Sequence, residues 1–218
     1  MTLISRVIFA GALLYCSVGS ALVFAEKSDS AESFTEILAS FETLQGNFVQ
    51  KIKDPDGKLV QETKGEFKVK RPGYFLWKIA PPYEQIVAGT PEKLKIYDPD
   101  LEQLTVHQND SLAGSPALLI SGDVKAIEAQ YNIEKQSSKN IYSFVLKNKQ
   151  TNDSSFESMT FVFKKSGKAF VLNAMSFADK LGQTTDVSLD KVKTNISLGA
   201  DVFEFSPPPG TDIIVNDP

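Results

Sequence analysis

The chain has 218 residues, of which 42% are hydrophobic, 23% charged and 10% aromatic, a balance that excludes a disordered polar tract and a membrane protein with many spans. Its 23 basic and 27 acidic side chains give a net charge of −4, so no basic surplus is available for a nucleic-acid backbone. One histidine and one cysteine provide little material for a zinc or iron site, or for a nucleophile paired with histidine. We therefore expect no cofactor, no metal and no catalytic residue.

The first 25 residues have the pattern of a secretory signal peptide. Arg6 is followed by the apolar run 7–24, which closes on Ala25 with small or permitted residues at the cleavage positions. A retained membrane anchor is disfavoured because the run is short and contains glycine and serine. Lipoprotein processing at Cys16 is disfavoured because the bulky Tyr15 stands where a small residue is needed.

Cleavage after Ala25 would remove Arg6 and the only cysteine, so that the mature chain could form no disulfide. A secreted domain of this length can be stable from its core alone, and the lack of a crosslink suits the periplasm better than a harsher exterior. We expect residues 1–25 to be removed and residues 26–218 to form a single periplasmic domain without linkers or repeats.

An amphipathic helix is predicted over about 30–43. Phe34, Ile37, Leu38 and Phe41 recur at steps of three and four residues and give this segment one apolar side. A second, short helix is predicted at 116–120, with Ser115 as its N-cap and Gly122 as its stop.

The rest of the chain predicts antiparallel strands. Apolar and polar residues alternate, and the connections are rich in proline, glycine and aspartate, as in the DPDG sequence of 54–57. A mainly β domain with helical additions follows from this pattern. The predicted strands are 48–53, 59–70, 74–79, 84–88, 93–97, 101–107, 131–135, 141–147, 156–164, 169–178 and 184–192.

The alternation places many apolar side chains on one side of the predicted sheet, with the polar side facing outward as its wet face. This surface could be an ordinary core covered by the two helices or the lining of a ligand cavity, and the pattern alone favours the core, since aromatic residues usually fill cores. The inward-facing set is Phe75, Trp77, Ile79, Phe144, Leu146, Phe161, Phe163, Phe170, Leu172, Val187 and Leu189.

Other candidate sites are better explained as structure. Asp54 and Asp98 flank prolines between strands and lack the remaining ligands of a calcium loop, so they predict turns. His107 lies near no serine or aspartate signature and is interpreted as a surface residue. Arg71 stands at a hinge between two strands, where its guanidinium could either bind several carbonyl oxygens or be solvated.

Several stretches resemble the family of periplasmic outer-membrane lipoprotein carriers (LolA-like). They occur in the family's order and span most of the mature chain, and the Lys-Arg-Pro followed by aromatic-x-Trp is the most specific of them. The segment 107–114 departs from the family's pattern. The stretches are 41–50 (FETLQGNFVQ), 65–77 (GEFKVKRPGYFLW), 96–103 (IYDPDLEQ), 115–120 (SPALLI), 131–133 (YNI) and 205–210 (FSPPPG).

The resemblance implies an unclosed antiparallel β-barrel covered by short helices, with a hydrophobic cavity that takes lipoprotein acyl chains. It implies that Arg71 locks the helical lid to the barrel. The implied lid residues are Phe34, Ile37, Leu38, Phe41, Leu118, Leu119 and Ile120, and the implied cavity residues are Phe75, Trp77, Ile79, Phe144, Leu146, Phe161, Phe163, Phe170 and Leu172.

It also implies a monomeric periplasmic chaperone that collects lipoproteins from an ATP-driven release complex in the inner membrane and delivers them to an outer-membrane receptor. A binding or sensing protein for free lipid or mislocalised lipoprotein is the alternative on the same fold. A lipid hydrolase is disfavoured because no catalytic triad signature is present.

Overall fold

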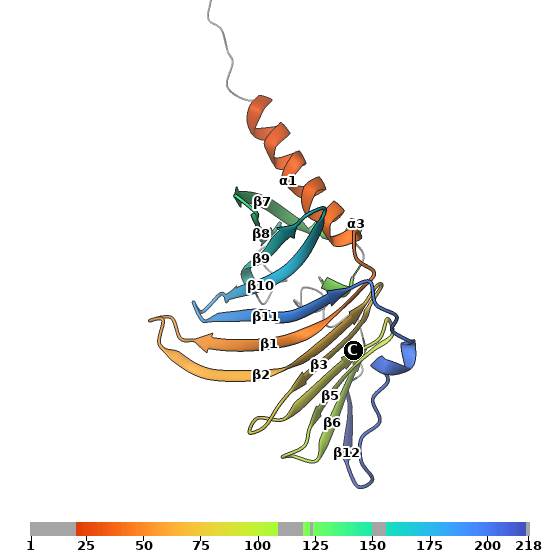
Figure 1. Cartoon of the computed structure of the whole chain (residues 1–218). Helices are drawn as coiled ribbons and strands as arrows, with labels where there is room; N and C mark the ends of the chain where they lie inside the picture. Colours follow the sequence, from red (N-terminus) through yellow and green to blue (C-terminus); the bar gives the residue numbers. More distant parts are fainter. Residues whose placement is uncertain (1–20, 109–119, 123, 150–155, 217–218) are drawn as a thin grey trace, which may run out of the picture.

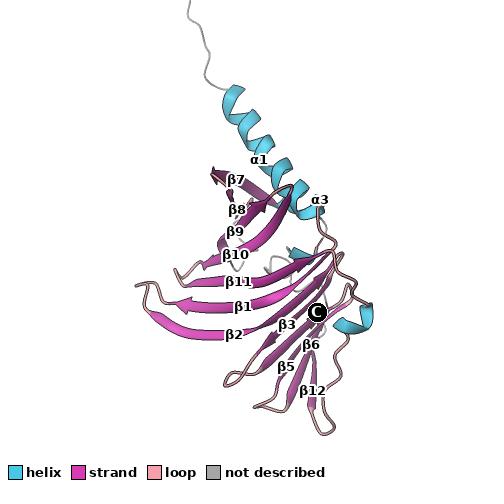
Figure 2. Cartoon of the chain, in the orientation of Figure 1, coloured by secondary structure: helices cyan, strands magenta, loops and turns pink. Residues whose placement is uncertain are grey.

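The computed structural model describes residues 21–108, 120–122, 124–149 and 156–216. One curved sheet forms most of the molecule, with helices α1 (Ala21–Ala39) and α3 (Val124–Gln130) beside the β7 end of the sheet (Figures 1 and 2). The strands are β1 (Thr43–Lys53), β2 (Leu59–Lys70), β3 (Tyr74–Ile79), β4 (Gln85–Gly89), β5 (Lys93–Asp98), β6 (Gln103–Gln108), β7 (Tyr131–Ser138), β8 (Ile141–Asn148), β9 (Phe156–Ser166), β10 (Ala169–Asp179), β11 (Thr184–Thr194) and β12 (Asp212–Asn216).

The sheet runs in the order β12-β6-β5-β4-β3-β2-β1-β11-β10-β9-β8-β7. Its two end strands, β12 and β7, do not pair with each other, so the sheet curves without closing, which confirms the expected mainly β, unclosed architecture. All eleven predicted strands are present. The pairing is antiparallel except between β12 and β6, which are parallel.

Three hairpin turns are held by the same kind of hydrogen bond, in which an aspartate carboxylate accepts backbone N–H groups. Oδ1 of Asp54 accepts the backbone N–H groups of residues 56 and 58, and Oδ1 of Asp98 accepts those of residues 100 and 101. Asp179 does the same for residues 181 and 183. A short carboxylate that bonds to the chain just after it stabilises a tight turn, so the turn interpretation of Asp54 and Asp98 is confirmed.

The concave face of the sheet carries the main core. Phe34, Ile37 and Leu38 of α1 are buried in this core, and the ring of Phe34 lies against rings of β8 and β9. The fully buried rings and aliphatic chains of the sheet alternate with polar residues, as a strand with one buried face requires. Examples are Phe48, Phe67, Phe144, Leu146, Phe161 and Phe163.

The convex face is not exposed to solvent throughout. This corrects the prediction that the outward side of the sheet is a polar, wet face. Leu76 and Ala88 point to this side and are buried under Phe203, which belongs to the 3-10 helix η2 (Ala200–Phe203). The segment 196–211, here called the C-terminal strap, crosses the outside of β3 to β5. Alternation could not reveal this cover, because apolar residues on both sides of a short strand look like one apolar run.

Helix α1 differs from its predicted limits, since it begins upstream, at Ala21, and ends at Ala39 instead of 43. The periodicity continues through Phe41, but that ring lies against Arg71 and the next residues are held by another part of the chain. The backbone N–H of Glu42 donates to Oδ1 of Asn195 at 2.8 Å, and the amide of Asn195 donates to the carbonyl of Ser40 at 3.1 Å. These tertiary contacts end the helix.

Three elements were not predicted: α3, η2 and β12. The first two are shorter than the window over which helical periodicity can be recognised. Strand β12 is short, entirely exposed and paired in parallel, so it lacks the alternating burial that reveals the other strands. Ile120 lies in a helical segment and is buried, whereas Leu118 and Leu119 of the predicted short helix lie outside the described residues.

A charge pair on the convex face gives a test by pH. The hydrogen bond from Lys53, at 2.8 Å, is the main cause that lowers the pKa of Asp186 below its ordinary value of 3.8, with a second bond from Ser176 and opposition from partial burial. Because the folded-state pKa is the lower one, the pair stabilises the fold above pH 3.8 and this stabilisation is lost as pH falls through the folded-state pKa.

Asp186→Asn is therefore expected to lower Tm slightly at pH 7, by the equivalent of less than about 1 kcal/mol because solvent reaches both charged groups. The difference between wild type and variant should shrink on acidification to pH 3. Thermal unfolding followed by circular dichroism at both pH values measures it, and a difference that grows on acidification would contradict the role given to Lys53.

Candidate functional site

Helix α1 covers the concave face at the β7 end of the sheet. The ring of Phe34 has no exposed area, and its centroid lies 5.1 Å from that of Phe144, 5.6 Å from that of Phe161 and 6.2 Å from that of Phe163. The helix is also held by polar contacts, since Lys135 of β7 donates to the hydroxyl of Ser33 at 2.9 Å. Over β8 and β9, the helix therefore occupies the space that a ligand would need.

The residues expected to line a cavity divide into two groups. Phe144, Leu146, Phe161, Phe163 and Leu172 are buried in the packed core, and Phe75 joins them at 3% exposure. The ring of Phe75 lies against Gly89, where an added Cβ would overlap it, so the site is tightly packed. Trp77, Ile79 and Phe170 are only partly buried and pack on the edge of this core.

The partly buried group continues along the concave face away from α1. Trp77 stacks on Phe48 with ring centroids 3.9 Å apart, and Ile79 lies two residues further along the same face of β3. Val87 and Ile96 were not predicted to line the cavity, although both share this face, since Val87 pairs with Trp77 and Ile96 pairs with Val87. The sequence alone does not give the register of the short strands β4 and β5, and this register decides which of their residues face the concave side.

A hollow of about 650 Å³ lies where β1, β2, β3 and β11 adjoin. Phe48, Ile79 and Leu189 contribute to its lining beside Gly65, where a Cβ would overlap the Phe48 ring and the carbonyl oxygen of Lys78. A larger residue at 65 would thus displace Phe48, which supports Trp77. The other lining residues are Asn47, Val49, Lys64, Glu66, Lys78, Ala80, Ser188 and Asp190.

Arg71 lies where three parts of the chain meet. Its guanidinium carbon is 5.0 Å from the centroid of the Phe41 ring, and its Nη1 donates to the carbonyl of Gly122 at 3.3 Å. The backbone N–H of Gly73 donates to the carbonyl of Ser121 at 2.7 Å. The structure therefore brings Arg71 together with Phe41, just after the end of α1, and with the segment that follows Ile120, while its role as a lock stays a prediction.

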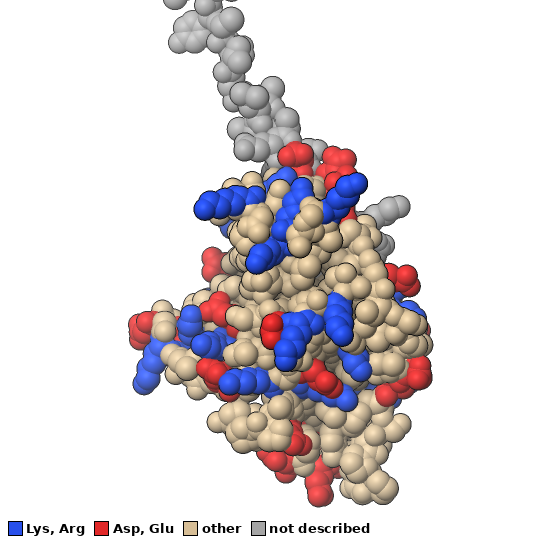
Figure 3. Space-filling view, viewed as in Figure 1, with Lys and Arg blue, Asp and Glu red and all other residues tan. Residues whose placement is uncertain are grey.

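Tyr131 is a buried ionisable residue of the core. Burial raises the pKa of the Tyr131 phenol above its ordinary value of 10.0. Within the described ranges, no group of three or more His, Cys, Asp and Glu side chains could hold a metal ion. Basic and acidic side chains lie intermixed over the face shown in Figure 3.

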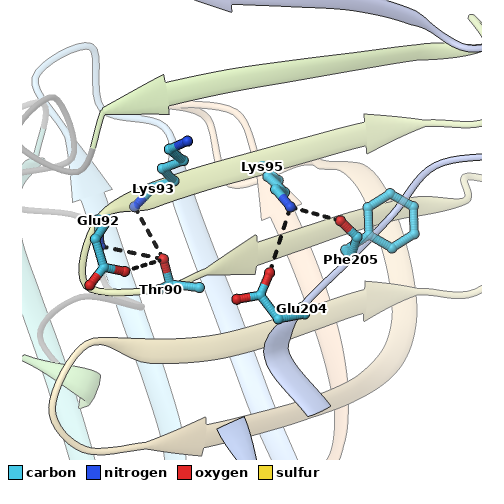
Figure 4. Close-up of polar contacts among 6 residues, drawn as sticks. All are labelled: Thr90, Glu92, Lys93, Lys95, Glu204 and Phe205. Carbon is cyan, nitrogen blue, oxygen red and sulfur yellow. Dashed lines mark hydrogen bonds and ion pairs between the residues drawn. The ribbon is translucent and has the colours of Figure 1, made fainter. Parts of the chain in front are cut away.

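The C-terminal strap is fixed on the opposite side of the sheet. Nζ of Lys95 donates to the carbonyl of Phe205 at 2.8 Å and lies 3.7 Å from Glu204, next to the turn held by Thr90 (Figure 4). The rings of Tyr97 and Phe205 are 5.1 Å apart. The strap thus braces the outside of β4 and β5 behind the partly exposed concave residues.

Two solved structures share this fold. A DUF1329 family protein from Desulfovibrio piger gives a TM-score of 0.52 at 11% identity, covering 82% of this chain and 97% of that one. An uncharacterised conserved protein from Thermus thermophilus gives 0.53 at 12% identity, covering 87% and 99%. In the part of the chain that the structure describes, no helix is long and apolar enough to cross a membrane.

Curated relatives are much closer in sequence. Proteins named outer-membrane lipoprotein carrier protein are 39% identical in Pseudomonas paraeruginosa and Pseudomonas aeruginosa, over 96% of this chain and 97% of theirs. A third, from Pseudomonas entomophila, is 36% identical over 91% of this chain and 93% of its own. The family model described as outer membrane lipoprotein carrier protein LolA matches residues 39–206, and the chain belongs to this LolA family.

Proposed function

We propose that this protein is a periplasmic carrier that shields the acyl chains of lipoproteins between the inner and outer membranes. The observation that supports this most directly is the apolar concave face, which α1 covers at the β7 end of the sheet and which carries partly exposed residues such as Trp77 and Ile79 further along. A packed core has no reason to leave these side chains partly accessible. The names of the relatives agree with this use.

The physical need for a carrier is large. A triacylated anchor has on the order of 45 methylene groups, and exposing them at about 0.8 kcal/mol each would cost roughly 35 kcal/mol. Measured affinities level off near about 20 kcal/mol, so binding must be incomplete or coupled to a cost such as displacing α1. Incomplete shielding also allows release to an acceptor.

The proposal includes the export of the protein to the periplasm and the two partners between which it carries lipoproteins. The apolar run 7–24 supports export and removal of residues 1–25, which would leave the single domain 26–218 in the periplasm. An ATP-driven release complex in the inner membrane would load the carrier, because the sequence contains no nucleotide-binding motif of its own. An outer-membrane receptor would then accept the lipoprotein. Binding of free lipid is the alternative that the test must separate.

Trp77 makes the test direct, because it is the only tryptophan of the chain. A triacylated lipopeptide whose acyl chains carry bromine should quench Trp77 fluorescence at stoichiometric concentration, since bromine quenches only at close contact. Ile79→Glu should fold but bind at least about tenfold more weakly, because a carboxylate would meet hydrocarbon. The matched control is Lys68→Glu, on the opposite face of the adjacent strand.

The outcomes distinguish the two ligands. Quenching by the lipopeptide, weakened by Ile79→Glu and unchanged by Lys68→Glu, supports the carrier. Quenching by a brominated free fatty acid that the lipopeptide cannot displace supports the free-lipid alternative. No quenching by either removes Trp77 from the acyl site. Transfer of a labelled lipoprotein from inner-membrane vesicles with ATP, and then to outer-membrane vesicles, tests the two partners separately.

A further inference from the structure

Four hairpin turns stand in a row at one end of the sheet. They join β10 to β11, β1 to β2, β3 to β4 and β5 to β6, and the strand order makes each hairpin the neighbour of the next (Figure 1). The first two turns are in contact, since a Cβ at Gly182 would lie 3.3 Å from Cβ of Pro55. We call residues 54–60, 80–84, 98–102 and 179–183 the turn rim.

Each turn of the rim presents an exposed apolar side chain. Val60 is 61% exposed, Tyr83 53%, Leu101 68% and Leu181 83%. Among the described residues, the other strongly exposed large apolar side chains are Leu59, also on the rim, and three residues of β12. A single exposed leucine needs no explanation, but an apolar side chain on each of four adjacent turns at one end of the sheet is typical of an interaction surface.

The tips are held in place before any partner binds. The Asp98 carboxylate fixes the backbone that carries Leu101, and the Asp179 carboxylate accepts the N–H of Leu181 itself. A rigid loop loses little conformational freedom on binding, so more of the gain from burying its tip is kept as affinity. These turns therefore have the rigidity expected of preformed anchors.

The charge of the rim indicates the kind of partner. Acidic residues outnumber basic ones seven to two within it. In Figure 3 the lower edge of the molecule, where β5 and β6 end, carries acidic side chains. Such a rim repels anionic lipid and complements a basic protein surface. The acidic residues are Asp54, Asp56, Glu84, Asp98, Asp100, Glu102 and Asp179, and the basic ones are Lys58 and Lys180.

We propose that the turn rim is a docking surface for a protein that presents basic side chains around small apolar pockets. The inference goes beyond the carrier function and does not rest on it, because the rim residues are distinct from the concave residues assigned to acyl binding. Apolar tips would supply affinity, and the surrounding carboxylates would accelerate association and select for a basic partner.

The first experiment places the photoreactive residue p-benzoylphenylalanine at positions 101 and 181 of the full chain in living cells, with the exposed positions 134 and 191 as controls. The expected result is an adduct with the same protein from both rim positions, at least about tenfold stronger than from the controls. Absence of a rim-specific adduct overturns the proposal.

The second experiment measures the affinity of the purified carrier for the protein found in that adduct. The double variant L101S/L181S should bind at least about tenfold more weakly, whereas I214S/V215S, which removes two exposed apolar residues of β12, should change binding less than about twofold. The variant D56N/D100N should slow association about threefold at low salt and weaken its salt dependence. Equal binding by L101S/L181S and wild type overturns the proposal.

Lipid binding is the competing outcome. Vesicles of phosphatidylethanolamine and phosphatidylglycerol are sedimented with wild type and with L101S/L181S. Co-sedimentation of wild type that the variant loses would make the rim a membrane contact and overturn the protein-docking proposal. Equal behaviour of the two proteins supports it. Circular dichroism confirms the fold of each variant, which the exposure of these positions leads us to expect.

Discussion

Replacing Phe34 with alanine is expected to lower the free energy of unfolding by about 3 to 5 kcal/mol, the cost of removing a large ring from a packed core. Phe34 has no exposed area and contacts three phenylalanine rings of β8 and β9. The loss combines the transfer energy of the ring with the cavity left behind, because the sheet side of the contact cannot collapse fully. Urea unfolding followed by circular dichroism measures it.

Phe170→Ala is the matched control, since Phe170 is partly exposed and its ring packs edge-on against a single aromatic neighbour, Tyr142. Its loss should be less than half of that of Phe34→Ala. Comparable losses from the two variants would contradict the central packing of Phe34. A loss below about 1 kcal/mol for Phe34→Ala would mean that α1 does not rest on the sheet in solution.

Phe34→Ala also tests how a ligand enters the concave face. If acyl chains must occupy the space beneath α1, the helix has to move, and Phe34 is its deepest contact with the sheet. Phe34→Ala should therefore accelerate quenching of Trp77 by the brominated lipopeptide at a temperature where the variant is fully folded. The cost of moving α1 would also explain how a carrier can bind strongly and still release its cargo.

The strands were predictable because their signals are local. Phe67 and Val69 alternate with charged residues, and the turns around Asp54, Asp98 and Asp179 are encoded within five residues. The strap and β12 were not predictable in the same way. Burial of Leu76 under Phe203 joins residues far apart in sequence, and no local pattern contains that pairing.

The end of α1 shows the same limit. Its apolar spacing continues to Phe41, and only the partners Arg71 and Asn195 decide that the helix stops at Ala39. The candidate site was predicted as one inward-facing set, which alternation can provide. The division of that set into the packed Phe144 and the partly exposed Trp77 depends on where α1 lies, which is a tertiary property.

We call α1 and the helical segment at residues 120–121 the helical cover. Arg71→Leu should shift the equilibrium of this cover toward an open arrangement, in which it has moved away from the sheet. The variant loses the bond from Nη1 to the carbonyl of Gly122 and the contact of the guanidinium with the Phe41 ring. A hydrogen bond of a charged group contributes about 1.5 to 3 kcal/mol, so the closed arrangement should lose roughly that amount. Every 1.36 kcal/mol corresponds to about a tenfold change in the equilibrium between closed and open.

The sign of the effect on binding follows from which arrangement binds. If only the open form accepts acyl chains, the apparent dissociation constant is the intrinsic one divided by the open fraction. A larger open fraction then gives tighter apparent binding of the brominated lipopeptide by about tenfold or more, and slower transfer to an acceptor. Stopped-flow quenching of Trp77 measures both rates, with Arg71→Lys as the control that keeps the charge but not the planar donors.

The two substitutions separate a lock from a simple charge effect. Because the lysine ammonium cannot reproduce the stacked guanidinium over Phe41, Arg71→Lys should fall between wild type and Arg71→Leu in apparent affinity. Equal rates in all three proteins would remove Arg71 from the movement of the cover. Weaker binding by Arg71→Leu would reverse the assignment, since it would mean that Arg71 holds the binding-competent arrangement instead of the closed one.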